Sequence, residues 1–204
     1  MIDLYAAGTS NGLRARMALE ECALTYKLHP VALEKGENKT PQFLALNPNG
    51  QIPVIIDHEG PGGRSVTLSQ SSAILVYCAE KSGKLMPKEG AKRAAMSQAL
   101  MSASTDITPT MGSIFAVQRS KEPHAPTASL FKERFRQYFK VWDGALGRQA
   151  YAAGEEMTIA DLSLYAGWVR IKAVSPDLCE GLTNLERWAA EMAARPSMQR
   201  AVRF

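Results

Sequence analysis

The first 80 or so residues alternate between strand-like and helix-like hydrophobic patterns. Short apolar runs bounded by turn residues predict strands at 2–7, 26–33, 53–57 and 65–68. Apolar residues at helical spacing predict helices at 12–24, 41–48 and 69–83. Strands that alternate with helices in this order predict a sheet covered by helices.

From Ala91 onward the strand pattern disappears and the apolar residues keep helical spacing, with Pro109 placed to kink one helix. Thr158 and Asp161 have the spacing of a capping box at the start of another helix. One apolar stripe consists of Met96, Leu100, Ala103, Ile107 and Met111. We therefore predict an α/β half joined to an all-α half. The expected division is a domain at 1–83, a linker at 84–90 and a helical domain at 91–204.

Composition narrows the class of protein. With 46% hydrophobic and 22% charged residues the chain has the balance of a soluble globular protein. No apolar run is long enough for a membrane span, and the start lacks the basic region of a signal peptide. The three cysteines lie far apart, which favours a cytoplasmic protein without a disulfide framework or a metal site. The net charge is +4, but the basic residues are scattered among acids, which argues against nucleic-acid binding.

Three short stretches of the sequence contain candidate catalytic or binding residues. The first is "GTSNG", where Thr9, Ser10 and Asn11 lie between the first predicted strand and helix. Hydroxyl and amide donors at a helix N-terminus would favour a thiolate over a thiol. An ordinary turn with a helix cap explains the same residues.

The second stretch is "NGQIPVI", which ends in a predicted strand. A cis Ile52–Pro53 bond would direct the Ile52 backbone outward, where an extended peptide could pair with it. A trans proline at the start of a strand is the alternative. The third stretch is "LSQSSAIL", where Gln70 and Ser71 precede a helix that could bind a carboxylate. Plain N-capping by a serine is the alternative there.

In combination these motifs resemble the bacterial cytosolic glutathione transferases. The resemblance is carried by "LNPNGQIPVIID", "LSQSSAILVYCAEKSGKLMP", "MTIADLSLY" and "LERWAAEMAARPSMQRA", and it covers essentially the whole chain. The resemblance to the Nu-class branch and its yeast prion-domain relatives is the strongest. In these proteins the turn commonly has the sequence T-P-N-G. The resemblance implies a thioredoxin-like domain followed by a helical domain, and a homodimer.

The resemblance also implies roles for individual residues. Thr9 and Asn11 would face the glutathione sulfur. The glutathione-binding set would be Asn38, Lys39, Gln51, Ile52, the cis-proline Pro53, Gln70, Ser71 and, from the helical half, Arg134. Asn38 or Lys39 would reach the glycyl carboxylate, and Arg134 the same group. Gln70 stands where the family more often has Glu or Asp.

The turn departs from the Nu pattern because Ser10 stands in place of proline. Ser10 also stands where theta- and delta-like transferases carry a catalytic serine. Two interpretations therefore compete, one with Ser10 as the main thiolate donor and one, which the flanking sequence favours, with Thr9 and Asn11. No cysteine occupies the turn, which excludes a mixed disulfide there.

The implied function is activation of glutathione as a thiolate for attack on a small electrophile or a disulfide, without a metal. Candidates for the wall of the second-substrate pocket are Met101, Ser104, Ile107, Met111 and Phe115, although helix core explains each of them equally well. The alternative function is a regulatory or glutathione-binding protein on the same fold. The intact "NGQIP" and "QSSAI" elements argue against a lost glutathione site.

Overall fold

The structure is a computed structural model that describes residues 1–204, and it divides into two compact units. The first unit comprises Met1–Met86 together with Ala193–Phe204, and the second comprises Pro87–Met192. The division at Met86 lies within the linker expected at 84–90. The C-terminal residues, which we expected in the helical domain, instead group with the first unit.

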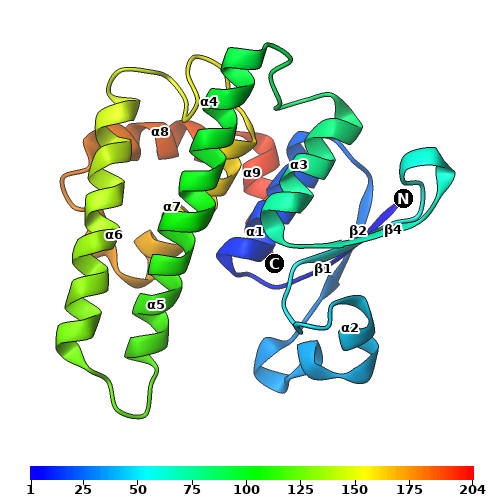
Figure 1. Cartoon of the computed structure of the whole chain (residues 1–204), viewed down its shortest axis with the longest axis horizontal. Helices are drawn as coiled ribbons and strands as arrows, with labels where there is room; N and C mark the ends of the chain where they lie inside the picture. Colours follow the sequence, from blue (N-terminus) through cyan, green and yellow to red (C-terminus); the bar gives the residue numbers. More distant parts are fainter. The chain divides into compact units, whose positions relative to one another are not determined.

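The first unit contains a four-stranded sheet in the order β2-β1-β3-β4. Strand β1 is parallel to β2 and antiparallel to β3, and β3 is antiparallel to β4. Figure 1 shows α1 and α3 on one side of this sheet and α2 on the other. The strands are β1 (Ile2–Ala6), β2 (Tyr26–Pro30), β3 (Val54–Asp57) and β4 (Val66–Ser69). The helices are α1 (Ser10–Glu21), α2 (Pro41–Leu46), α3 (Ser71–Ser82) and α9 (Pro196–Ala201), with short 3₁₀ turns at Leu33–Lys35, Glu37–Lys39 and Pro61–Gly63.

Alternation along β1 explains how both faces of the sheet are covered. Ile2, Leu4 and Ala6 are buried, and side chains alternate between the two faces of a strand. Tyr5 points to the other face, where it packs against a cluster that includes Phe43 of α2. The βαβ unit followed by a hairpin and a helix confirms the sheet covered by helices that the sequence pattern predicted and the thioredoxin-like arrangement that the family resemblance implied.

Ion pairs explain why the C-terminal segment belongs to the first unit. The Arg195 guanidinium donates to both Glu21 carboxylate oxygens, at 2.6 and 2.9 Å, and Ser197 also donates to Glu21. Arg200 pairs with Glu20 at 2.7 Å. These contacts join α9 to the C-terminal end of α1, which the hydrophobic pattern alone could not reveal.

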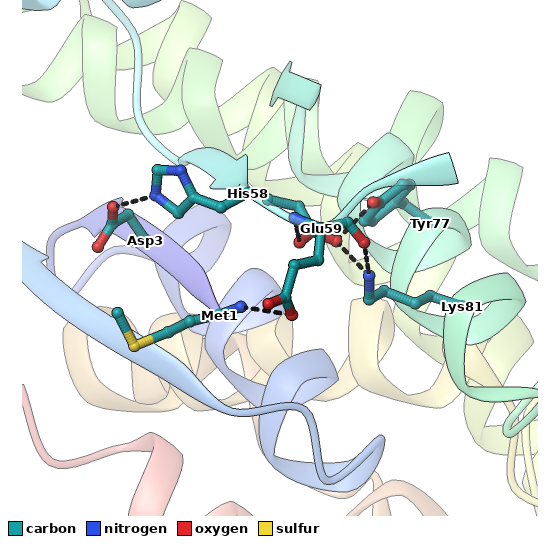
Figure 2. A network of polar contacts seen from close by, with 7 residues as sticks. Met1, Asp3, His58, Glu59, Tyr77 and Lys81 are labelled. Carbon is teal, nitrogen blue, oxygen red and sulfur yellow. Dashed lines mark hydrogen bonds and ion pairs between the residues drawn. The ribbon is translucent and has the colours of Figure 1, made fainter. Parts of the chain in front are cut away.

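A second polar network connects β1, the end of β3 and α3, as Figure 2 shows. The Asp3 carboxylate lies 2.7 Å from His58 Nε2. Asp57 accepts hydrogen bonds from the Tyr77 hydroxyl and the Lys81 ammonium, both at 2.6 Å. Burial would raise the pKa of Asp57, but the bonds from Lys81 and Tyr77 outweigh it and hold that pKa below its ordinary value. The network fixes α3 against the sheet.

The second unit is entirely helical, as the sequence predicted. Its elements are α4 (Gly90–Met101), the π-helical segment η4 (Ser102–Ile107), α5 (Thr108–Gln118), α6 (Ala125–Leu146), α7 (Ile159–Val174), the 3₁₀ turn Pro176–Cys179 and α8 (Thr183–Ala193). The π-helical segment η4 precedes Pro109, and Pro109 itself lies in the first turn of α5, so the kink expected at Pro109 stays a prediction. Thr108 Oγ1 donates to the Ala103 carbonyl at 2.8 Å within this wider turn.

The core of the second unit follows the predicted stripes. All five residues of the stripe from Met96 to Met111 are buried. The predicted capping box at Thr158 and Asp161 is present, and Trp188 Nε1 also donates to the buried Asp161 carboxylate at 3.1 Å. None of the helices is both long and apolar enough to cross a membrane.

Candidate functional site

The turn between β1 and α1 is shaped by Gly12 and Thr9. A Cβ atom at Gly12 would lie 2.0 Å from the Ala7 carbonyl oxygen, so only glycine allows this close approach. Thr9 is the N-cap of α1, and its Oγ1 accepts a hydrogen bond from the Gly12 backbone N–H at 3.1 Å. The Thr9 oxygen is therefore engaged in capping, while its own hydroxyl hydrogen can still be donated.

Asn11 connects this turn to the third stretch. Its Oδ1 accepts from the Arg14 guanidinium at 2.6 Å and from the Ser71 hydroxyl at 3.3 Å. Both donors bind the same oxygen, so the amide Nδ2 is the end of the side chain that remains to donate. The structure thus brings Asn11 and Ser71 together across 60 residues of sequence.

Ser10 differs from its two neighbours. It is the first residue of α1, and 8% of it is exposed. Its hydroxyl makes no hydrogen bond within the chain.

The "NGQIP" stretch forms a loop before β3 in which the Ile52–Pro53 bond is cis. The Ile52 backbone N–H and C=O make no hydrogen bond within the chain, so both groups can pair with an extended ligand. The buried Asn47 holds the loop, because its Nδ2 donates to the Gln51 carbonyl at 2.7 Å. Nothing in the sequence alone distinguishes Asn47, since an Asn next to a proline is typical of any turn.

Gln70 and Ser71 form the junction between β4 and α3. Gln70 has φ +73°, a region that side chains other than glycine rarely adopt. Its side chain is exposed and makes no capping bond to α3. Such backbone strain is often found where a side chain serves a binding site.

Asn38 and Lys39 lie against the "NPNG" loop. The Asn38 amide donates to the Gly50 carbonyl at 2.7 Å, whereas the Lys39 ammonium lies 3.4 Å from the Asn49 and Gly50 carbonyls. A Cβ atom at Gly50 (φ +59°) would lie 2.7 Å from Lys39 Nζ. Lys39 is charged, and its contacts with the loop are longer than the hydrogen bond that Asn38 makes. Lys39 is therefore better suited than Asn38 to bind a carboxylate.

The remaining candidates belong to the second unit. Arg134 is exposed on α6. Ile107 and Met111 are buried, Ser104 is half-buried, and Met101 is 48% exposed. Phe115 is half-buried, and the Arg119 and Arg170 guanidinium carbons lie 5.7 and 5.5 Å from its ring centre.

The chain's own thiols are poorly suited to nucleophilic chemistry. All three cysteines are buried. Burial raises the pKa of the Cys22 and Cys78 thiols and raises that of Cys179 to about 11. These thiols are therefore protonated at neutral pH, and a reactive thiolate at the "GTSNG" turn would have to come from a bound ligand.

Comparison with known proteins assigns both halves of the chain to one family. Residues 10–81 match the family model of the glutathione S-transferase N-terminal domain, and residues 96–196 match that of its C-terminal domain. The disulfide-bond oxidoreductase YfcG of Escherichia coli (strain K12) is 32% identical over 207 residues, which cover 99% of this chain and 94% of that protein.

Two solved structures share the whole fold. A glutathione transferase family member from Pseudomonas fluorescens pf-5, with two glutathione molecules bound, has a TM-score of 0.93 at 30% identity and covers 98% of this chain and 92% of its own. A glutathione transferase from Pseudomonas putida, with one glutathione disulfide bound per subunit, has a TM-score of 0.91 at 30% identity, with coverage of 100% and 91%. The chain therefore belongs to the glutathione S-transferase family of enzymes.

Proposed function

We propose that the first unit binds glutathione along three of its segments, which contain Ile52, Gln70 with Ser71, and Lys39. The cysteinyl backbone pairs with Ile52, the γ-glutamyl end is held by Gln70 and Ser71, and the glycyl carboxylate is bound by Lys39. The observation that carries this proposal is the Ser71–Asn11 hydrogen bond, because it puts the γ-glutamyl candidate beside the thiolate candidate. The unpaired Ile52 backbone supports it. Arg134 remains a candidate for the glycyl carboxylate, as the family resemblance implies.

The bound thiol is activated as a thiolate by donors from the turn. A free thiol has a pKa of about 8.5, and lowering it by about 2 requires roughly 2.7 kcal/mol of differential stabilisation. One hydrogen bond to a charged group supplies about 1.5–3 kcal/mol. The N-terminus of α1 adds about 0.3–1 kcal/mol. Asn11 Nδ2 and the Thr9 hydroxyl are the donors that fit this requirement.

The thiolate then attacks a second substrate. With an electrophile, a carbon–sulfur bond forms and the leaving group departs with its electron pair. With a disulfide, a glutathione mixed disulfide forms and the other sulfur leaves as a thiolate. Similarity to YfcG, together with the T-x-N-G turn, supports a Nu-like enzyme that performs the disulfide reaction. Homodimer assembly and a cytoplasmic location stay predictions from the family resemblance and the scattered free cysteines.

Calorimetry with reduced glutathione, followed by turnover assays with an aryl halide and with a dialkyl disulfide, tests this function. We expect saturable binding and turnover of at least one of these two substrate types. Binding without turnover of either would favour the regulatory alternative. No binding of reduced or oxidised glutathione would contradict the proposal.

A further inference from the structure

Arg14 is a buried cation next to the candidate thiolate site. Its side chain is among the largest in the chain that are fully buried, and it is 1% exposed. It lies three residues after Asn11 on α1, so the two side chains share one face of the helix. The contact between them, at 2.6 Å from Nη1 to Oδ1, is the shorter of the two hydrogen bonds that Asn11 accepts.

Burial of the Arg14 guanidinium costs free energy, which is hard to explain if Arg14 only fills space in the core. Burial lowers the pKa of Arg14 to about 10, so the group still carries its charge at neutral pH. A buried charge costs free energy that an apolar side chain of similar volume would avoid. A function at the site would explain why the cost is tolerated.

We propose that Arg14 is a positioning residue that fixes the Asn11 amide with Nδ2 toward the glutathione sulfur, an inference that rests on the proposed function. The amide of an asparagine can rotate so that its oxygen and nitrogen exchange places. With Oδ1 turned toward the sulfur, the side chain would present a lone pair to a thiolate and repel it. The Arg14 charge binds Oδ1 and prevents that rotation, and Ser71 assists from α3.

A double-mutant cycle on the bound thiol tests this role. The pKa of glutathione bound to the protein is followed by thiolate absorbance in the wild type, Arg14→Met, Asn11→Ala and the double variant. We expect Arg14→Met to raise this pKa by about 1, the size expected for the loss of one hydrogen bond. In the Asn11→Ala background the same substitution should add little, because Arg14 acts through Asn11. Arg14→Lys, which keeps a charged donor, should recover most of the effect.

Arg16→Met is the matched control. Arg16 lies on the same helix, but its guanidinium binds the Tyr26 hydroxyl and the Arg203 carbonyl, away from Asn11. Its replacement removes a positive charge from α1, and we expect the pKa of the bound thiol to stay at the wild-type value. An equal rise in Arg16→Met would mean that net charge, and not orientation of the amide, sets the pKa.

Asn11→Asp tests the same idea without altering Arg14. The new carboxylate can pair with Arg14, so we expect folding to be preserved, but it has no N–H donor for the sulfur. The bound thiol should then have a higher pKa in Asn11→Asp than in Asn11→Ala. A value at or below that of the wild type would overturn the proposal.

The outcomes separate the two proposals. A lowered pKa in the wild type with additive effects of Arg14→Met and Asn11→Ala would overturn the role of Arg14 and leave the proposed function standing. Loss of thermal stability in Arg14→Met with an unchanged pKa would do the same, since it would show a purely structural residue. An ordinary thiol pKa in the wild-type complex would overturn both.

Discussion

The Ser71 hydroxyl donates a 3.3 Å hydrogen bond to Asn11 Oδ1, which joins the first turn of α3 to the first turn of α1. Two helix N-termini therefore meet at one place in the first unit. The positive ends of their dipoles both favour negative charge there. A ligand with an anionic sulfur and an anionic carboxylate at its γ-glutamyl end suits such a place.

Ser71→Ala removes this hydrogen bond and one polar group at the N-terminus of α3. We expect glutathione affinity to fall about 5- to 10-fold, since a single hydrogen bond contributes about 1 kcal/mol. Calorimetric titration measures the change. Ser97→Ala is the control, because Ser97 is exposed on α4 and donates to the Arg93 carbonyl within its own helix. Unchanged affinity in Ser71→Ala would argue against the assigned γ-glutamyl site.

Thr9→Ala removes the N-cap of α1. We expect the free energy of unfolding to fall by about 1 kcal/mol, because the Gly12 N–H loses its acceptor. Thr9→Ser keeps the hydroxyl and should retain most of the stability. Urea denaturation of the three proteins measures these differences, and equal stability of Thr9→Ala and the wild type would show that the cap contributes nothing.

Glu21→Gln should destabilise the first unit in a pH-dependent way. Burial would raise the pKa of Glu21, but the bonds from Arg195 and Ser197 outweigh it and hold that pKa below its ordinary value of about 4.3. A carboxylate with a lowered pKa contributes stability that is present above the ordinary pKa and lost as the pH falls through the lower folded value. The melting temperature of the variant should therefore lie below that of the wild type at pH 7, and the gap should shrink below about pH 4.

Glu34→Gln is the control for this pH series, since Glu34 is exposed and makes no ion pair. Its melting temperature should follow that of the wild type at every pH. A gap between Glu21→Gln and the wild type that stays constant down to pH 2 would contradict the ion-pair explanation.

Ile107 and Met101 should respond differently to truncation. Ile107 is buried, so Ile107→Ala should cost about 2–4 kcal/mol of stability. Met101 is largely exposed, so Met101→Ala should change stability by less than about 0.5 kcal/mol. If Met101 contacts the second substrate, its truncation should raise the KM for an apolar electrophile. Denaturation and steady-state kinetics on both variants separate core residues from pocket residues.

Local patterns in the sequence predicted much of the fold. Gly83 ends α3 in a left-handed conformation, and Thr158 and Asp161 form the predicted capping box. These features depend on residues a few positions apart, which a single sequence displays. The helix predicted at 12–24 begins earlier, at Ser10, because the capping role falls to Thr9.

Local sequence patterns could not predict features that depend on pairs of residues far apart in the sequence. The grouping of the C-terminal residues with the first unit rests on Arg195 and Glu21, which are 174 positions apart. In the sequence, Arg14 has the position of an ordinary polar residue on a predicted helix. Only its burial and its hydrogen bond to Asn11 in the structure distinguish it from the other polar residues of α1. Motifs in the sequence indicate the candidate site, whereas the contacts that support it are visible only in the structure.

The measurement that tests the central claim most directly is the pKa of the glutathione thiol bound to the wild type, Asn11→Ala and Ser10→Ala. Thiolate absorbance is followed across pH with saturating ligand. We predict a bound thiol pKa well below about 8.5 in the wild type and in Ser10→Ala, and a clear rise in Asn11→Ala. An unperturbed thiol in the wild-type complex, or a loss of activation in Ser10→Ala alone, would contradict the assignment of Asn11 and Thr9 as the thiolate donors.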